Sequence, residues 1–237
     1  MGGEQREDDG CTFGTAPEDR ALLARTRAAP VLAGPLPEFA PEDAPDTPGL
    51  LFARWLERAL DDGVPEPHVM TLGTAGADGE PSARVLMLRG IDIADCACAF
   101  ASDADSPKGR DLAANPRAAL TWYWPAHGRQ IRMTGPVDVL GAGAARRDYL
   151  GRSAAARTAG FTGRMSRPLS GPAEYERARQ AAQALVEDEP GRVPDGHTLY
   201  RLRARRAEFF QADPRRFHLR VRYTRTGDGW TRTLLWP

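Results

Sequence analysis

Two groups of basic and hydroxyl-bearing residues have the types and spacing that suit an anionic ligand. The first contains Arg84, in the stretch SARVLMLR, then Ser102, and then Ser106-Pro107-Lys108. Ser-Pro is a typical helix start, where free N–H groups and the helix dipole favour an anion. An arginine, a hydroxyl and a lysine near such a start could together hold one phosphate. From spacing alone, solvated surface charges remain the alternative interpretation.

The second group lies near the C-terminus, where Arg216, His218, Arg220 and Arg222 occupy alternate positions. In a β-strand this spacing places all four side chains on one face. Neighbouring cationic groups on one strand face repel one another unless an anion or solvent lies against that face. The pattern therefore predicts either an anion-binding strand face or a strand edge in water, and charge does not decide between them.

Composition excludes several classes of function. The 32 basic and 32 acidic residues give a formal net charge of zero, which argues against a general nucleic-acid binder. No long apolar run predicts a membrane span, and MGGEQREDDG lacks the features of a secretory signal. The three cysteines favour a reducing, cytoplasmic setting. Among the 32 basic residues Lys108 is the single lysine. A GC-rich coding sequence would explain the many arginines, but it does not explain why this lysine is retained.

Motifs for other chemistry are missing from the sequence. There is no glycine-rich phosphate loop after a strand, no GxSxG and no HExxH. Cys96 and Cys98 have the spacing of half a zinc site, but no second half follows, so no metal is predicted. We interpret His68, His127 and His197 as surface or core residues.

The surrounding pattern predicts a mostly β protein with added helices. Residues 1–45 contain repeated prolines and no sustained period, which predicts a flexible N-terminal arm that is disordered or extended, before a domain at 46–237. Helices are expected at about 47–61, 106–115 and 172–187. Short strands are expected at 68–75, 81–90, 96–102, 117–124, 129–140 and in the C-terminal region. Because no β-α-β alternation appears, we expect a closed antiparallel barrel.

The two groups, with the strands between them, resemble the FMN-dependent pyridoxamine 5′-phosphate oxidase family. The likeness spans about residues 48–237, in the order of the family's motifs. It rests on Arg84–Arg89, Phe100-Ala101-Ser102, Ser106–Arg110, Asn115-Pro116-Arg117, Tyr123-Trp124, Arg129-Gln130, Glu208–Gln211 and Arg216–Tyr223. Within the family, Pro37-Glu38-Phe39 and the helix around Trp55 are most similar to flavin oxidases of phenazine biosynthesis.

The resemblance implies a homodimeric, FMN-binding split β-barrel with FMN at the subunit interface. It implies an oxidase that passes a hydride from a small dihydro-aromatic carboxylate to flavin and then to O2, giving H2O2, in secondary metabolism. Arg84 and Lys108 would bind the phosphate, and Gln130 would lie near the ring. The full implied cofactor set is Arg84, Val85, Met87, Leu88, Ala101, Ser102, Lys108, Gln130, Phe210 and Arg220. Arg216 and His218 would be catalytic, and the substrate would contact Arg89, Arg152, Arg216 and His218.

Some positions depart from the family pattern. Pro107, Pro168-Leu169 and Phe210 replace an arginine, a Gln-Ser pair and a tryptophan that contact FMN in the family. Where the vitamin oxidases bind the substrate phosphate with Lys, Tyr, Arg and Ser, this chain has Arg89, Asp148, Arg152 and Ala156. An aspartate beside a phosphate is unfavourable. This departure favours an aromatic carboxylate substrate. The alternatives are a pyridoxine/pyridoxamine 5′-phosphate oxidase and a non-enzymatic flavin- or haem-binding protein.

Overall fold

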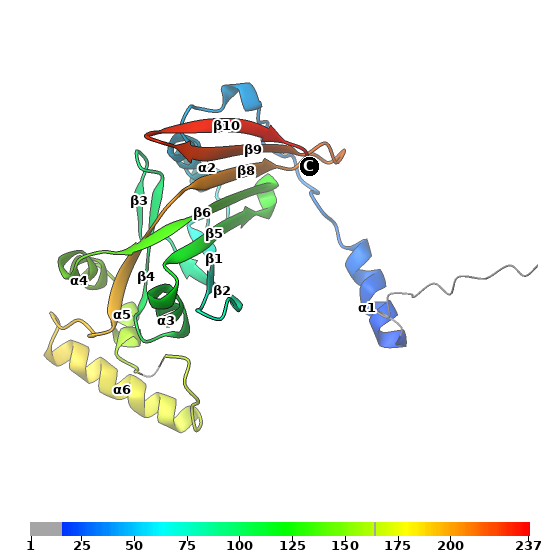
Figure 1. Cartoon of the computed structure of the whole chain (residues 1–237). Helices are drawn as coiled ribbons and strands as arrows, with labels where there is room; N and C mark the ends of the chain where they lie inside the picture. Colours follow the sequence, from blue (N-terminus) through cyan, green and yellow to red (C-terminus); the bar gives the residue numbers. More distant parts are fainter. Residues whose placement is uncertain (1–15, 164) are drawn as a thin grey trace, which may run out of the picture.

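The structure, a computed structural model, describes residues 16–163 and 165–237 and is built on a ten-stranded antiparallel sheet (Figure 1). The strands are β1 Val69–Ala75, β2 Pro81–Met87, β3 Gly90–Asp92, β4 Ala97–Asp103, β5 Arg117–Trp124, β6 Arg129–Val139, β7 His197–Arg203, β8 Arg206–Gln211, β9 Leu219–Thr226 and β10 Gly229–Leu235. The helices are α1 Pro17–Ala28, α2 Pro48–Asp61, α3 Pro107–Ala114, α4 Ala142–Leu150, α5 Ala154–Gly160 and α6 Pro172–Asp188, with 3-10 turns at Pro41–Asp43 and Pro125–His127.

Strand β6 belongs to two branches of the sheet and gives the barrel its split form. The main path runs β10-β9-β8-β6-β5-β1-β2, while β7, β4 and β3 branch from the far end of β6. Residues 129–134 pair with β8, and residues 137–139 pair with β7. At Gly135 the Arg203 carbonyl approaches so closely that a Cβ would overlap it, so only glycine allows this change of partner. The Arg89 N–H donates to the Ala99 carbonyl at 2.8 Å and links the end of β2 to β4.

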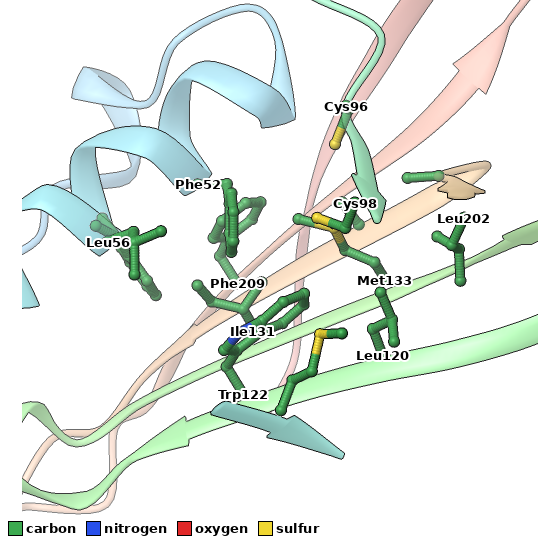
Figure 2. Packing of buried hydrophobic residues seen from close by; sticks show 14 of the residues in the cluster. Phe52, Leu56, Cys96, Cys98, Leu120, Trp122, Ile131, Met133, Leu202 and Phe209 are labelled. Atoms are coloured by element: carbon green, nitrogen blue, oxygen red, sulfur yellow. The ribbon is translucent and has the colours of Figure 1, made fainter. Parts of the chain in front are cut away.

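The interior of the barrel is apolar and is covered at one side by α2 (Figure 2). Inward-facing strand residues alternate with outward-facing ones, as in Trp122 of β5 and Phe209 of β8, which are fully buried. The α2 stripe packs onto them: the Phe52 and Trp122 ring centroids are 5.0 Å apart, and those of Trp55 and Phe209 are 5.3 Å apart. Each such burial contributes roughly 1.5–3 kcal/mol. On this helix Leu51, Trp55 and Leu56 are buried in the core, whereas Leu50 and Leu60 are exposed.

The segment before α2 differs from the expected extended arm. Residues 17–28 form α1, which has Pro17 at its start, acidic residues in its first turn and arginines in its last. None of its residues is buried, and it stands away from the barrel (Figure 1). The chain then returns to the barrel, where the Phe39 and Trp55 rings pack edge to face at 5.2 Å. Residues 1–15 lie outside the described part, and the domain boundary at 45 stays a prediction.

Besides α1, two further helices were not anticipated from the sequence. α4 and α5 follow β6, and with α6 they lie at the end of the molecule opposite β10 (Figure 1). The predicted helices at 47–61, 106–115 and 172–187 correspond to α2, α3 and α6. No helix within the described residues has the length and apolarity needed to cross a membrane.

Candidate functional site

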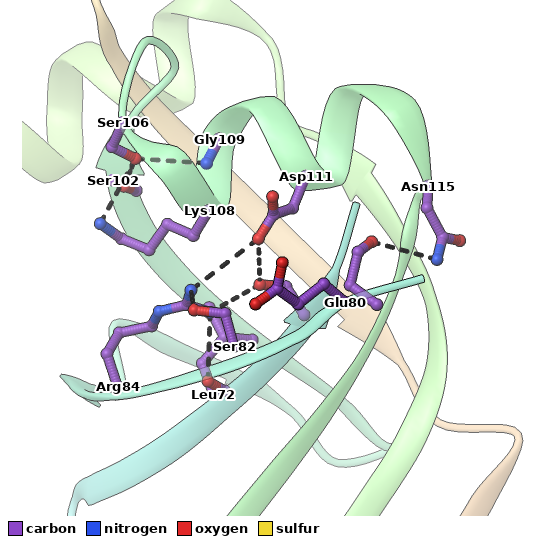
Figure 3. A network of polar contacts seen from close by, with 12 residues as sticks. Leu72, Glu80, Ser82, Arg84, Ser102, Ser106, Lys108, Gly109, Asp111 and Asn115 are labelled. Carbon is purple, nitrogen blue, oxygen red and sulfur yellow. Dashed lines mark hydrogen bonds and ion pairs between the residues drawn. The ribbon is translucent and has the colours of Figure 1, made fainter. Parts of the chain in front are cut away.

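The first sequence group converges at the start of α3, as Figure 3 shows. Ser106 is the N-cap, and its Oγ accepts a hydrogen bond from the Gly109 N–H at 3.2 Å. The same oxygen lies 3.0 Å from the Ser102 hydroxyl of β4 and accepts from the Lys108 Nζ at 3.4 Å. A Cβ on Gly109 would overlap the Ala104 carbonyl, so the helix start needs a glycine there. These contacts hold an ammonium and two hydroxyls beside the free N–H groups of a helix.

Arg84 is held next to this helix by polar contacts of β1 and β2 (Figure 3). Its guanidinium donates to the Thr74 Oγ1 at 2.6 Å, to the Ser82 Oγ at 2.7 Å and to the Leu72 carbonyl at 3.3 Å. The Thr74 hydroxyl donates in turn to the Asp111 carboxylate of α3 at 2.7 Å. Asp111 lies 3.9 Å from the guanidinium, so the arginine is oriented by neighbours and has no tight ion pair.

Electrostatics in this group favour an added anion. Burial lowers the pKa of Lys108, and the nearby positive charge of Arg84 lowers it further against the opposing effect of Asp103. Burial also lowers the pKa of Arg84, with partial compensation from Asp111. The two cations are therefore desolvated and repel each other, and a phosphate between them would relieve both effects. This donor set fits the phosphate of a nucleotide cofactor.

A cavity of about 180 Å³ opens beside these residues. Ser102 and Lys108 line one side, and Arg152 and His197 line the other. Leu86 and Ala101 contribute apolar surface. The cavity thus connects the candidate phosphate group with residues of the α4 region and β7.

The second wall of the cavity is organised by one buried carboxylate. The side chain of Asp148 is 8% exposed; its Oδ1 accepts from the Arg89 Nε at 2.7 Å, and its Oδ2 accepts from the Arg152 Nη2 at 2.7 Å. The His197 Nε2 lies 3.1 Å from the same Oδ2. Burial opposes the charged form, but the hydrogen bonds and charges of both arginines outweigh it, so the pKa of Asp148 lies below its usual value.

The second sequence group divides into a turn and a strand. β9 begins at Leu219, so the prediction that all four cationic residues share a strand face is wrong for Arg216 and His218. Arg216 has a left-handed backbone, with φ 72°, and its N–H donates to the Asp213 carbonyl at 2.9 Å. His218 accepts from the Asp213 N–H at its Nδ1, at 3.1 Å. The Asp213 turn therefore replaces the first part of the expected strand.

Three of the predicted cofactor residues form a row across the outer face of the sheet. Gln130 of β6 is the cross-strand partner of Phe210 of β8, which is the partner of Arg220 of β9. The Phe210 ring centroid lies 5.0 Å from that of His218, so the turn packs against this row. The repulsion expected on this face is relieved by Glu208, which binds Arg220 at 2.8 Å and the Arg132 side chain at 2.8 Å.

The row and the α3 group lie on opposite faces of the sheet. Arg84 is the partner of the fully buried Leu72 and shares its inward face, whereas Gln130 alternates with the fully buried Ile131 and points outward. Val85 and Met87 of β2 also point outward and are 64% and 52% exposed. Leu88 is partly buried against the core. The structure thus gathers Arg84, Ser102, Lys108 and Ala101 in one place and Gln130, Phe210, Arg220 and His218 in another.

Comparison with known proteins identifies the family of this chain. Residues 56–209 match the pyridoxamine 5′-phosphate oxidase domain, and residues 197–237 match the pyridoxine 5′-phosphate oxidase C-terminal dimerisation region. The chain belongs to the FMN-dependent pyridoxamine 5′-phosphate oxidase family. The resemblance inferred from the sequence is therefore confirmed, as are the split-barrel fold, the oxidoreductase class and the FMN cofactor of the family. The dimerisation region supports a homodimer.

Individual relatives of this family member show two kinds of likeness. A pyridoxine/pyridoxamine 5′-phosphate oxidase from Bordetella pertussis is 36% identical over 197 residues, which cover 83% of this chain and 92% of that protein. The structure of PhzG from Burkholderia lata, in complex with tetrahydrophenazine-1-carboxylic acid, has a TM-score of 0.79 and 29% identity, covering 86% of this chain and 100% of that one. An FMN-binding, pyridoxamine 5′-phosphate oxidase-related protein from Nostoc punctiforme shares the fold, with a TM-score of 0.62 and 19% identity over 85% of this chain and 100% of that one.

Sequence reasoning missed several residues that shape the site of this oxidase family member. His197 was interpreted as a surface or core histidine, yet it lines the cavity and contacts Asp148. Thr74 and Asp111, which orient Arg84, carried no motif. One signal was available: Asp148 and Arg152 are four residues apart, the spacing that pairs charges along a helix.

Proposed function

We propose that this chain is an FMN-dependent oxidase of a small dihydro-aromatic carboxylate, similar to a dihydrophenazine carboxylate, in secondary-metabolite biosynthesis. The observation that carries this proposal is the Asp148 carboxylate, which already satisfies Arg89 and Arg152 where a phosphate-bearing substrate would need free cations. The likeness to PhzG of Burkholderia lata, whose structure contains tetrahydrophenazine-1-carboxylic acid, supports the same substrate class.

The cofactor site we propose uses two subunits. Arg84, Lys108 and Ser102 of one chain would hold the FMN phosphate, because they form the desolvated cation and hydroxyl group at the start of α3. Gln130 and Arg220 point to the opposite side of the sheet, so a second chain would have to bring them to the same cofactor. The C-terminal dimerisation region and the exposed Trp236, at 92%, are consistent with a partner on that side.

The residues of the chain would mainly bind, orient and exchange a proton. When bound, the flavin supplies the two-electron chemistry, taking a hydride from the substrate and delivering electrons to O2 with formation of H2O2. Because the His218 Nδ1 accepts from the Asp213 N–H, its Nε2 carries the proton in the neutral form and could donate it. The exposed Arg216 guanidinium could bind a carboxylate. Phe210, packed on His218, would exclude water from one side.

A pyridoxine/pyridoxamine 5′-phosphate oxidase is the second candidate. Relatives with this name are 36% identical over most of the chain, and both arginines that pair with Asp148 are present. Under this alternative, the substrate phosphate would have to displace the Asp148 carboxylate from at least one of them. The membership of an oxidase family gives less support to a non-enzymatic flavin- or haem-binding role.

Substrate oxidation by the FMN-loaded dimer tests the proposal. We expect stoichiometric FMN in the purified protein, and peroxide release with 5,10-dihydrophenazine-1-carboxylate at a kcat/KM at least about tenfold above that with pyridoxamine 5′-phosphate. The reverse ratio would establish the second candidate. A protein that binds no FMN after reconstitution would rule out both oxidases.

A further inference from the structure

Both carboxylate oxygens of Asp148 accept hydrogen bonds from neighbouring side chains. Its Oδ1 accepts from Arg89, and its Oδ2 accepts from both the Nε and the Nη2 of Arg152, at 3.2 and 2.7 Å. His197 contacts the same Oδ2 from β7 at 3.1 Å. Side chains from three segments of the chain, around residues 89, 152 and 197, thus contact one carboxylate. An anion that entered the cavity would meet the Arg152 guanidinium, which already pairs with Asp148.

The charge count at this wall leaves room for one negative charge at most. Arg89 and Arg152 are cationic and Asp148 is anionic, while burial, followed by the charge of Arg152, lowers the pKa of His197 and favours its neutral form. The wall therefore carries one net positive charge. A phosphate monoester carries between one and a half and two negative charges near pH 7, roughly twice the charge of a carboxylate.

The carboxylate is also fixed in place by its neighbours in the fold. Tyr149 follows it on α4, is buried, and donates its hydroxyl to the Arg157 carbonyl of α5 at 2.5 Å. The Tyr149 ring also packs on His197, with centroids 5.0 Å apart. Because α4 is anchored on both sides, rotation of the helix to release the arginines would disrupt this packing.

We propose that Asp148 is a specificity-determining residue: its carboxylate acts as an internal anion on Arg89 and Arg152, so that this side of the site, away from Lys108, rejects substrates that are phosphate monoesters and accepts substrates with one negative charge or none. This inference rests on the proposed function and names its substrate class. It makes the aspartate, rather than the arginines, the difference between a vitamin phosphate site and an aromatic carboxylate site.

Ligand binding to the FMN-loaded dimer tests the role of Asp148 without turnover. We would measure pyridoxamine 5′-phosphate and inorganic phosphate by calorimetry on the wild type and on Asp148→Asn. The variant leaves both arginines uncompensated, so we expect both ligands to bind at least about tenfold more tightly to it. Asp138→Asn is the matched control, because Asp138 also bridges two arginines, Arg201 and Arg203, on β6 and β7. It should leave both affinities unchanged.

The wild type alone provides a second measurement if the variant does not fold. Pyridoxamine 5′-phosphate and pyridoxamine should bind to it with affinities within about threefold of each other, since the phosphate finds no free cation. Phosphate binding that is unchanged in Asp148→Asn, or a wild type that prefers the phosphorylated ligand by tenfold or more, would overturn the inference. If the ligands bind as expected but the FMN-loaded protein does not oxidise the dihydrophenazine carboxylate, the proposed function fails and the inference about Asp148 stands.

Discussion

Two groups of basic side chains, one behind each wall of the cavity, are in opposite electrostatic states. On the α3 side, Lys108 and Arg84 are desolvated and repel each other, and the Arg84 guanidinium lies 3.9 Å from the Asp111 carboxylate. On the α4 side, Arg89 and Arg152 share Asp148 at 2.7 Å each. The first wall gains by binding an anion, and the second already contains one. Removal of a charge should therefore weaken anion binding at the first wall, whereas at the second it should lower folding stability and strengthen anion binding.

The largest effect is expected for Lys108→Met on FMN affinity. The methionine keeps the length of the side chain but removes the ammonium, so the dissociation constant should rise about 100-fold, as for loss of a charge-assisted hydrogen bond of about 3 kcal/mol. Flavin fluorescence titration measures it. Arg110→Met is the control, because Arg110 is exposed and donates to the Asp105 carbonyl. Equal effects of the two changes would show that the phosphate site lies elsewhere.

At the other wall, Asp148→Asn should lower the free energy of unfolding by about 2 kcal/mol at pH 7. The native pKa of Asp148 is lowered, so its stabilisation is present above the unfolded pKa of about 3.9 and is lost as pH falls through the native value. Urea unfolding from pH 7 to pH 3 measures the difference between wild type and variant. A difference that stays constant in acid would contradict the ionic role of this carboxylate.

Ser106→Ala separates helix capping from ligand binding. Loss of the N-cap should cost about 1 kcal/mol, or a Tm decrease of about 2–4 °C. FMN affinity should also fall severalfold, because the Ser106 Oγ contacts Ser102 and Lys108. Ser153→Ala provides the comparison, since Ser153 caps α5 in the same way. A similar loss of FMN affinity in both variants would assign the effect to stability alone.

The smallest effect is a gain in stability of the FMN-free protein in Lys108→Met. Because the native pKa of Lys108 is lowered, its charged form costs stability below that pKa, and the cost disappears as pH rises toward the unfolded value of about 10.4. The Tm of the apoprotein should therefore rise by about 2 °C at pH 7, with a smaller difference at pH 10. A decrease in Tm would mean that the ammonium stabilises the empty site.

Much of the fold was predictable because local signals agreed with the tertiary structure. The apolar stripe of α2, the Ser-Pro start of α3 and the Asp78-Gly79 turn of the first hairpin each have a local physical cause. Helix α1 was missed because no apolar stripe marks it and because residues 1–45 were treated as one proline-rich arm. Most of the prolines of that arm follow the helix. The prediction of a strand through Arg216 was wrong because the Asp213 side chain and carbonyl accept hydrogen bonds from the next backbone N–H groups and form a turn there.

The site was predictable where one short segment carried the chemistry. Lys108, Ser106 and Gly109 lie in one helix start, so an anion site could be predicted there, with solvated surface charges as the alternative. The wall around Asp148 joins residues from the β2–β3 junction, α4 and β7, and contacts across 59 and 49 positions leave no local pattern. Similarly, the separation of Gln130 and Arg220 from Arg84 depends on strand register, which only the folded sheet defines.

The placement of the two cofactor sets on opposite faces of the sheet has a genetic consequence. Under the proposed arrangement, each site in the dimer takes one set from each subunit. A chain that lacks the Lys108 ammonium, paired with a chain that lacks the Arg220 guanidinium, would then form one doubly defective site and one intact site. Two inactive alleles expressed together would restore activity through intersubunit complementation, although neither chain can complete a site with its own copy.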